Sequence, residues 1–153
     1  MPSETSFLSS YLPYLLRRAD QTLSEPFYAV LTKYGVARSE WRLLAVLREL
    51  GELAVVDLAT AALSPQPTVT HALRRLEKRG LVSRTAGTND KRQRFISITP
   101  TGAQLTTTLI DEAKQLEADA LVEAGDLSTL VEQLHELTAT VEARIQKRAE
   151  MRG

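Results

Sequence analysis

The stretch LSPQPTVTHALRRLEKRGLVSRTAGTNDKRQRFISIT, Leu63 to Thr99, decides the fold of this chain. Its first half is apolar along one side of a helix, because apolar residues recur there at spacings of three and four. These residues are Val69, Ala72, Leu73 and Leu76. The opposite side carries Pro67, His71, Arg74 and Lys78. The pattern therefore predicts a helix that packs on one side and is basic on the other.

The ends of this helix carry their own signals. Ser64 is expected to be the N-cap, with Pro65 at the first helical position and Pro67 still in the first turn, where no backbone N–H is needed. Gly80 is expected to end the helix. Beyond it, β-branched and apolar residues predict strands at 81–85 and 94–99, joined by a turn at 87–90. The stretch is thus read as a helix followed by a β-hairpin.

Positive charge is concentrated in this stretch. Residues 63–99 contain eight Lys or Arg and two acids, a net charge of +6, whereas the whole chain has 19 of each sign and a net charge of zero. The remaining residues therefore carry −6. A basic segment within a neutral protein is the electrostatic signature of a site for a polyanion such as nucleic acid. A merely solvated helix face is the alternative, since charged helix faces are common.

Length and composition limit the class of protein. With 153 residues the chain forms one or at most two domains with a real core. It has no apolar run near the roughly 20 residues of a membrane span and no secretory signal pattern, so a cytoplasmic protein is expected. The absence of cysteine excludes disulfides and thiol chemistry, and the two histidines lie far apart, so neither a metal nor another cofactor is expected.

The segments before the basic helix also have helical periodicity. Residues 7–33 predict a long amphipathic helix, in which Pro13 lies in the first turn or causes a kink and Pro26 bends or breaks the helix. Gly35 closes this segment. Ser39 is expected to cap a second helix that extends to Leu50 and stops at Gly51.

A short strand and a short helix then lead into the basic helix. Residues 52–55 are predicted to add an edge strand to the hairpin, and residues 57–62 to form a brief helix. The turn at 63–64 joins this helix to the basic one, which gives a helix-turn-helix. After the hairpin, Thr99 and Pro100 predict the start of a long helix ending near Gly125, and Asp126 is expected to cap the last helix.

The terminal helices have apolar rows for which a single copy of the chain offers no obvious cover. The most economical interpretation is that they pack against a second copy, and an intramolecular bundle is the alternative. We therefore expect residues 1–35 and 100–153 to form a helical dimerisation region intertwined with a DNA-binding region at 36–99. The expected dimer contacts are Leu8, Leu12, Leu127, Leu130, Leu134, Leu137, Val141 and Ile145.

The order of these elements resembles the multiple antibiotic resistance regulator (MarR) family of winged helix-turn-helix transcription factors. The resemblance spans nearly the whole chain and is most specific in RRLEKRGLVSR and NDKRQRFISITPTG, between Leu73 and Gly102. It implies a mainly α fold with a small β-wing and dimerisation helices at both termini. It also implies a homodimer that binds pseudo-palindromic operator DNA, usually as a repressor, and that small aromatic or phenolic ligands often release from the DNA.

A helix about 10–12 Å wide fits the major groove, where its N-terminal residues reach the base edges. Gln66, Thr68, Thr70, His71 and Arg74 are the candidates for base contacts, although His71 is equally well explained as a solvated residue. Phosphate contacts, or in part intramolecular ion pairs, are expected of Arg75, Lys78 and Arg79. The remaining candidate DNA-binding residues are Ser64, Pro67, Arg84, Lys91, Arg92 and Arg94. By resemblance, Arg92 enters the minor groove and Asp90 holds an arginine in place; a local turn clamp is the alternative role for these two.

The resemblance also implies a ligand cleft between the dimerisation helices and the DNA-binding part. The residues assigned to it are Tyr11, Tyr14, Arg17, Arg18, Trp41 and Arg42. Aromatic rings and a guanidinium suit an aromatic acid, but an aromatic residue at helical spacing, such as Trp41, is more often part of the core.

Three function classes compete. A dimeric operator-binding repressor accounts for the charge, the wing and the terminal helices together. A winged-helix module for protein interactions does not need basic residues gathered at the hairpin tip. An enzyme is disfavoured, because the sequence has no nucleophile-base set, metal-ligand cluster or glycine-rich phosphate loop.

Overall fold

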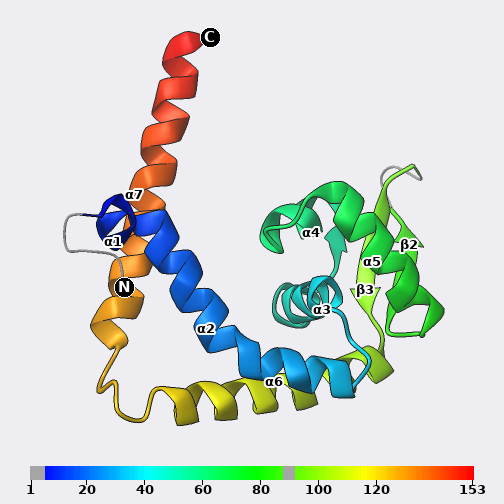
Figure 1. Cartoon of the computed structure of the whole chain (residues 1–153). Coiled ribbons are helices and arrows are strands. Elements are labelled where there is room, and N and C mark those ends of the chain that lie inside the picture. The colour runs from blue at the N-terminus through cyan, green and yellow to red at the C-terminus, as the bar shows by residue number, and fades with distance from the viewer. Residues whose placement is uncertain (1–5, 88–91) are drawn as a thin grey trace. The chain divides into compact units, whose positions relative to one another are not determined.

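The computed structural model describes residues 6–87 and 92–153. In chain order the elements are α1 (Phe7–Ser10), α2 (Leu12–Lys33), α3 (Arg38–Leu50), β1 (Leu53–Ala54), α4 (Val55–Ala61), α5 (Gln66–Lys78), β2 (Val82–Ala86), β3 (Arg94–Ile98), α6 (Pro100–Ala120) and α7 (Ser128–Arg152) (Figure 1). The chain divides into two compact units, the first ending at Glu117 and the second comprising Ala118–Gly153. The mainly helical fold with a small β-wing is therefore as the sequence predicted.

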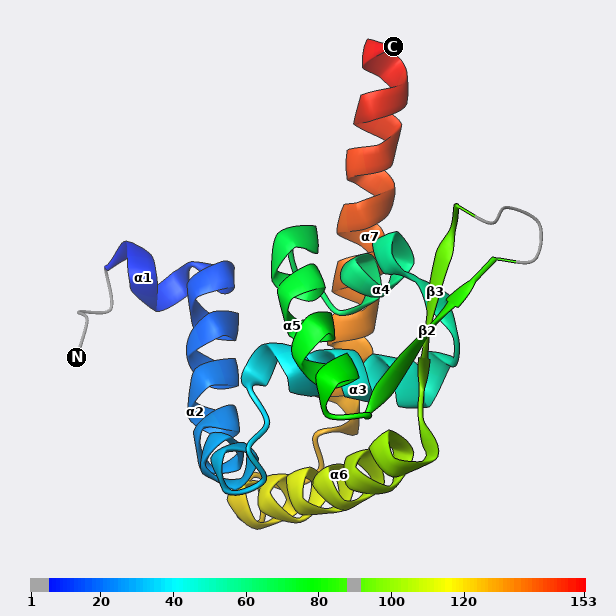
Figure 2. The same ribbon diagram turned by 90° about the vertical axis from the view of Figure 1, so that its right-hand side faces the viewer.

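The three strands form one antiparallel sheet in the order β1, β3, β2. Strand β3 lies in the centre, where Leu53 pairs with Ile96 on one side and Arg84 pairs with Ile96 on the other. The predicted edge strand at 52–55 is thus confirmed as β1. Figure 2 shows α5 beside the β2–β3 hairpin, with α3 and α4 completing the winged helix-turn-helix.

One hydrophobic core holds this first unit together. It lies between α3, α4, α5 and the sheet, and the C-terminal part of α2 and the first half of α6 close it. Its largest almost completely buried aliphatic side chains are Leu31, Leu43, Leu44, Leu47, Leu58, Val69, Leu73, Leu76, Ile96 and Leu109. Burial of each such side chain contributes about 1.5–3 kcal/mol relative to exposure. The predicted packing side of α5 is therefore the side that is buried.

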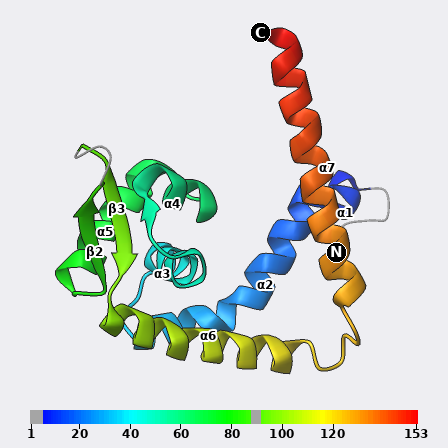
Figure 3. The same ribbon diagram turned by 180° about the vertical axis from the view of Figure 1, so that it is seen from behind.

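Helix α2 shows how the two prolines act. Pro13 occupies the first turn, after a break at Tyr11 that separates α1 from α2. Pro26 lies inside α2, and the ribbon changes direction along its length without interruption (Figures 1 and 3). Of the two outcomes expected for Pro26, the structure has the bend. Because of this bend the C-terminal part of α2 runs alongside α6, as Figure 3 shows from behind.

The predictions that Ser39 caps α3 and that Ser64 caps α5 are both wrong. The N-cap of α3 is Ala37, and Ser39 lies inside the first turn, where Glu40 accepts the N–H of Ala37 instead (3.1 Å). The N-cap of α5 is Pro65, which the sequence placed at the first helical position. Since Pro65 is extended (ψ 143°), Ser64 lies outside the helix, and its hydroxyl donates to the Ala62 carbonyl (3.1 Å).

The predicted end of α5 at Gly80 and the predicted start of α6 at Thr99 are confirmed, whereas α6 ends at Ala120 and not near Gly125 as predicted. Gly80 has φ +70°, and the N–H groups of Gly80 and Leu81 donate to the carbonyls of Glu77 and Leu76, which caps the end of α5. Thr99 caps α6, because its hydroxyl accepts the N–H of Gly102 (3.0 Å) while donating to the Gly80 carbonyl (2.7 Å).

Helix α7 begins at Ser128, later than the sequence suggests, and buries none of its side chains. Asp126 was predicted to be the N-cap, but the N-cap is Leu127; the Asp126 carboxylate, one residue earlier, accepts the N–H of Ser128 (2.9 Å) and so supports the start of α7. Hydrogen bonds from the backbone and side chain of Ser128 hold the pKa of the Asp126 carboxyl below its usual value.

Candidate nucleic-acid interface and ligand pocket

The exposed face of α5 carries most of the predicted DNA-binding residues. Pro67 sits in the first turn of the helix, and Pro65, Gln66 and Pro67 at its N-terminal end are exposed to solvent. Exposed side chains on α5 are those of Gln66, Pro67, Thr68, His71, Arg74, Arg75 and Lys78. Thr70 is half-buried, and its hydroxyl donates to the Gln66 carbonyl (3.0 Å). Ser64, in the preceding turn, is also half-buried.

A groove of about 500 Å³ separates the start of α5 from the β-hairpin. Gln66 and Thr70 line it from α5, and Arg84 and Arg94 line it from strands β2 and β3. Arg92, two residues before β3, also lines it and is exposed. The structure therefore brings five of the predicted DNA-binding residues to one surface. Lys91 and Asp90 lie outside the described residues.

Two polar residues of this groove were missed by the sequence analysis. Asp57, in the first turn of α4, and Gln93, just before β3, line the groove together with the arginines. The available signal for Asp57 was an acid at the expected start of the short helix that follows the edge strand. Its negatively charged carboxylate reduces the positive electrostatic potential at this end of the groove.

Three arginines of the basic stretch are held within the chain. The Arg79 guanidinium donates to the carbonyls of Gly35 (2.6 Å) and Tyr34 (3.2 Å) at the end of α2. Arg84 pairs with Glu77 (2.6 Å), the acid at the end of α5. Intramolecular contacts were an expected alternative for Arg79 but not for Arg84.

Arg75 is the third of these arginines, and it joins α5 to α3. Its Nε lies 3.4 Å from a carboxylate oxygen of Glu40, and its Nη2 donates to the Ser39 hydroxyl (3.3 Å). Glu40 was not among the residues that the sequence singled out. The signal was weak, because an acid in the first turn of a helix is ordinary for that position.

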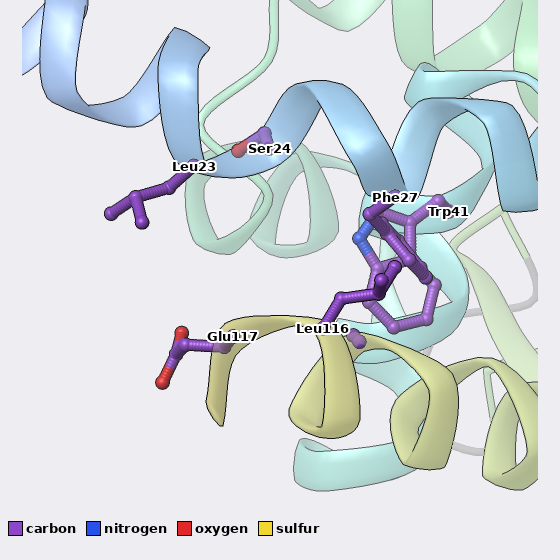
Figure 4. A pocket seen from close by; sticks show the side chains of 7 residues that line it. Leu23, Ser24, Phe27, Trp41, Leu116 and Glu117 are labelled. Carbon is purple, nitrogen blue, oxygen red and sulfur yellow. The ribbon is translucent and has the colours of Figure 1, made fainter. Parts of the chain in front are cut away.

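A small pocket of about 190 Å³ lies between α2, α3 and α6 (Figure 4). Trp41 and Phe27 meet there edge to face, with ring centroids 4.9 Å apart, and Leu116 lies against them. Trp41 is half-buried and packs on the hydrophobic core. The interpretation of Trp41 as a core residue is therefore supported, although one of its edges remains accessible.

Two larger cavities lie on either side of Arg42. One, of about 510 Å³, is lined by Asp20, Trp41 and Arg42, by Ala45 and Val46 of α3, and by residues 61–63. The other, of about 360 Å³, is lined by Arg17, Asp20, Gln21, Tyr28, Arg38 and Arg42. In the second, the Arg38 guanidinium carbon lies 3.6 Å from the centre of the Tyr28 ring.

Half of the predicted ligand residues thus come together. Arg17, Trp41 and Arg42 line these cavities, whereas Tyr11, Tyr14 and Arg18 line none of the three cavities around Trp41 and Arg42. Tyr11 instead stacks on Phe7, with ring centroids 4.5 Å apart. The sequence missed Asp20 and Arg38, which add one acid and one base to the lining.

Neither a metal-binding cluster nor a membrane-spanning helix is found within residues 6–87 and 92–153. These residues include no group of three or more acidic or histidine side chains able to hold a metal ion. In the same ranges, no helix has the length and apolar character needed to cross a membrane.

Comparison with known proteins shows to which family this chain belongs. Residues 36–93, which include α3 to α5 and β2, match the model of the MarR family. The HTH-type transcriptional regulator FarR of Neisseria gonorrhoeae is 31% identical over 115 residues, which are 75% of this chain and 77% of FarR. The chain belongs to the MarR family.

Other MarR-family proteins give the same picture. The homoprotocatechuate degradative operon repressor of Escherichia coli is 32% identical over 73% of this chain and 78% of the repressor. The crystal structure of NadR in complex with 4-hydroxyphenylacetate has a TM-score of 0.76 and 30% identity, and covers 92% of this chain and 97% of NadR. BpsR of Bordetella bronchiseptica, whose DNA binding is regulated by 6-hydroxynicotinic acid, has a TM-score of 0.71 and 25% identity, and covers 84% of this chain and 99% of BpsR.

The family assignment and the fold class predicted from the sequence are both confirmed. This MarR-family chain is a winged-helix transcriptional regulator, and the relatives it matches are regulators rather than enzymes.

Proposed function

We propose that this MarR-family protein is a homodimer that binds double-stranded, pseudo-palindromic operator DNA and represses transcription until a small aromatic or phenolic acid releases it. The observation that carries this proposal is the groove in which Gln66 and Thr70 of α5 face the arginines of the hairpin. A recognition helix and a basic wing on one surface suit a duplex, which offers base edges and phosphates side by side.

The division of labour on the DNA follows from side-chain chemistry. Gln66 pairs with adenine through its amide, and Arg74 pairs with guanine through two parallel hydrogen bonds. Thr68 offers a hydroxyl or a methyl group to a base edge. Arg92 and Arg94 lie at the hairpin, where they meet phosphates or the minor groove.

Dimerisation is supported by apolar side chains that the single chain leaves exposed. On α7, Leu130 is 47%, Leu134 36%, Leu137 36%, Val141 47% and Ile145 63% exposed. On α1 and α2, Leu8 is 41% and Leu12 is 45% exposed. Leu127, before α7, is half-buried. Rows of this extent on soluble proteins mark interaction surfaces, and a second copy presents the same rows.

The ligand class follows from the lining of the cavities beside Arg42. Arg17, Arg38 and Arg42 provide guanidinium groups for a carboxylate, and the accessible edge of Trp41 provides an apolar surface for a ring. The carboxylate of Asp20, which lines both cavities, accepts a hydrogen bond from a phenolic hydroxyl. Two relatives, NadR and BpsR, are described with hydroxylated aromatic acids, which supports this class.

DNA binding is tested with a duplex that the protein selects from a random-sequence pool. Affinity measured by fluorescence anisotropy should fall linearly with salt on logarithmic axes, with a slope of about −0.9 for each neutralised phosphate. The selected sites should read as two inverted half-sites about 10 base pairs apart. A flat salt response without sequence preference would favour the alternative, a winged-helix module for protein interactions.

Ligand binding is tested through Trp41, the only tryptophan of the chain. Titration with 4-hydroxyphenylacetate should change the intrinsic fluorescence and, over the same concentration range, release the selected duplex. Arg42→Gln should weaken both responses together. Arg48→Gln is the matched control, because Arg48 is exposed on the same helix and does not line these cavities. An unchanged spectrum and unchanged DNA binding would exclude this ligand class at the site.

A further inference from the structure

Arg75 and Glu40 differ sharply in exposure, although they form one ion pair. The Glu40 side chain is 5% exposed and the Arg75 side chain is 43% exposed. One Glu40 oxygen accepts the N–H of Ala37 (3.1 Å) and lies 3.4 Å from Arg75 Nε. The other oxygen, Oε2, is buried and makes no hydrogen bond with any of the described residues. Arg75 is therefore the main charge compensation of a buried carboxylate.

A buried carboxylate constrains its partner more than a surface pair does. Surface ion pairs are weak and easily rearranged, whereas a buried charge that loses its partner is strongly disfavoured. The guanidinium is further oriented by the Ser39 hydroxyl, so two residues of the first turn of α3 hold it. Arg75 is thus fixed toward α3, away from a role as a mobile phosphate contact.

One turn further along α5, Arg79 makes a similar attachment. It donates to the carbonyls of Tyr34 and Gly35, which precede α3. The second half of the recognition helix is consequently tied at two successive turns to the segment from Tyr34 to Glu40. Arg74 and Lys78, which neighbour these two arginines in sequence, are exposed.

We propose that Glu40 and Arg75 are positioning residues that fix the recognition helix α5 in its position against α3, and that Arg75 does not contact DNA. This inference rests on the proposed DNA-binding function. In α3, Glu40 is followed directly by Trp41 and Arg42, which line the cavities described above. The N-terminal part of α3 therefore connects the ligand cavities to the helix proposed to read the operator.

The two roles for Arg75 predict opposite effects of Glu40→Gln. This variant keeps an acceptor for the Ala37 N–H and removes only the charge. If Arg75 contacted a phosphate, removal of the nearby acid would leave operator affinity unchanged or raise it. If the pair positions α5, affinity for the selected duplex should fall about tenfold, in the range of coupling between two sites, while affinity for a poly(dI-dC) duplex stays the same.

The salt dependence of DNA affinity is a second measurement that distinguishes a positioning role of Arg75 from a phosphate contact. Lys78→Gln, on the exposed side of the same helix, is the matched control and should reduce the salt slope of a dimer by about 2. Arg75→Gln should lower affinity for the selected duplex as much as Glu40→Gln does, with the slope unchanged. The double variant should be no weaker than either single variant, because both remove the same contact.

Folding and the proposed function are checked in the same series. If Arg75→Gln does not fold, because it leaves the buried Glu40 carboxylate without its partner, the pair is replaced by Glu40→Met with Arg75→Met, which leaves no unpaired buried charge and should fold but lose operator preference. A reduced salt slope for Arg75→Gln, or full operator affinity in the folded Met pair, would overturn the inference while the wild-type protein still binds. Failure of the wild-type protein to bind any duplex would overturn the proposed function and this inference together.

Discussion

Replacement of Gly102 by alanine is the perturbation whose cost the structure defines best. Gly102 lies in the first turn of α6, where the helix passes the turn between α5 and β2. A Cβ atom at this position would lie 2.0 Å from the Leu81 carbonyl oxygen, 2.9 Å from its carbon and 3.0 Å from Cγ1 of Ile98. Ordinary Cβ contacts begin at 3.4 Å, so α6 and the Leu81 carbonyl must separate by about 1.4 Å.

This separation breaks the hydrogen bonds that join α6 to the end of α5. The Thr99 N–H donates to the Leu81 carbonyl (3.1 Å), and the Thr99 hydroxyl donates to the Gly80 carbonyl (2.7 Å). Each such bond contributes about 1 kcal/mol, and the steric strain adds about 1–3 kcal/mol. Alanine regains about 1 kcal/mol of helix propensity. The free energy of unfolding should therefore fall by about 3 kcal/mol, which lowers Tm by about 10 °C for a chain of this size.

The assay is thermal unfolding followed by circular dichroism at one fixed protein concentration. Gly80→Ala is the matched control, because Gly80 has φ +70° but no atom within 4 Å of the place that a Cβ would occupy, so it reports backbone strain alone. That strain costs about 1 kcal/mol. The reasoning is refuted if Gly102→Ala is as stable as Gly80→Ala or more stable.

Three further outcomes are expected. Arg92→Ala should weaken operator binding by about 1–3 kcal/mol if the wing reads DNA; equal anisotropy curves for the variant and the wild type would show that it does not. Leu137→Glu should convert the proposed dimer to a monomer in sedimentation equilibrium, with Glu136→Gln as the control, and a variant that stays dimeric would exclude α7 from the proposed interface. The pKa of Asp126 is lowered by its hydrogen bonds with Ser128. The stabilisation of the first turn of α7 by the ionised carboxylate is therefore fully present above the ordinary pKa of about 4. It is lost as the pH falls through the lowered pKa. The hydrogen-exchange protection factor of the amides at the start of α7 should fall there, but not in Asp126→Asn.

Most element positions were predictable because the signals are local. Apolar spacing gave α5 and its buried side, and Gly35, Gly51 and Gly80 marked helix ends that require a positive φ. The hairpin strands and the edge strand β1 followed from β-branched residues and turn signals. The two serine caps failed because a cap depends on where the helix starts to within one residue, and here Pro65 and Ala37 set that start.

The partners of the arginines were not predictable in the same way. Arg84 pairs with Glu77 across the turn from α5 to β2, and Arg75 pairs with Glu40, 35 residues earlier. Neither pair has a helical or strand periodicity that a sequence reveals. Counting charges indicated the type of partner, whereas the assignment of each charge required the packing of α3 against α5.

This sorting of charges changes what the basic stretch can do. The sequence counts eight Lys or Arg between residues 63 and 99, and one phosphate contact for each would give a salt slope of about −7 per protomer. Arg75, Arg79 and Arg84 are held by groups of the protein itself. A cation that remains bonded to its own protein on the DNA releases no counterion, so the slope per protomer should be clearly smaller than the charge count suggests. The basic stretch therefore serves two purposes, since part of its charge fixes the recognition helix to the fold, while another part, which includes the exposed Arg74 and Lys78, faces the solvent from which DNA would approach.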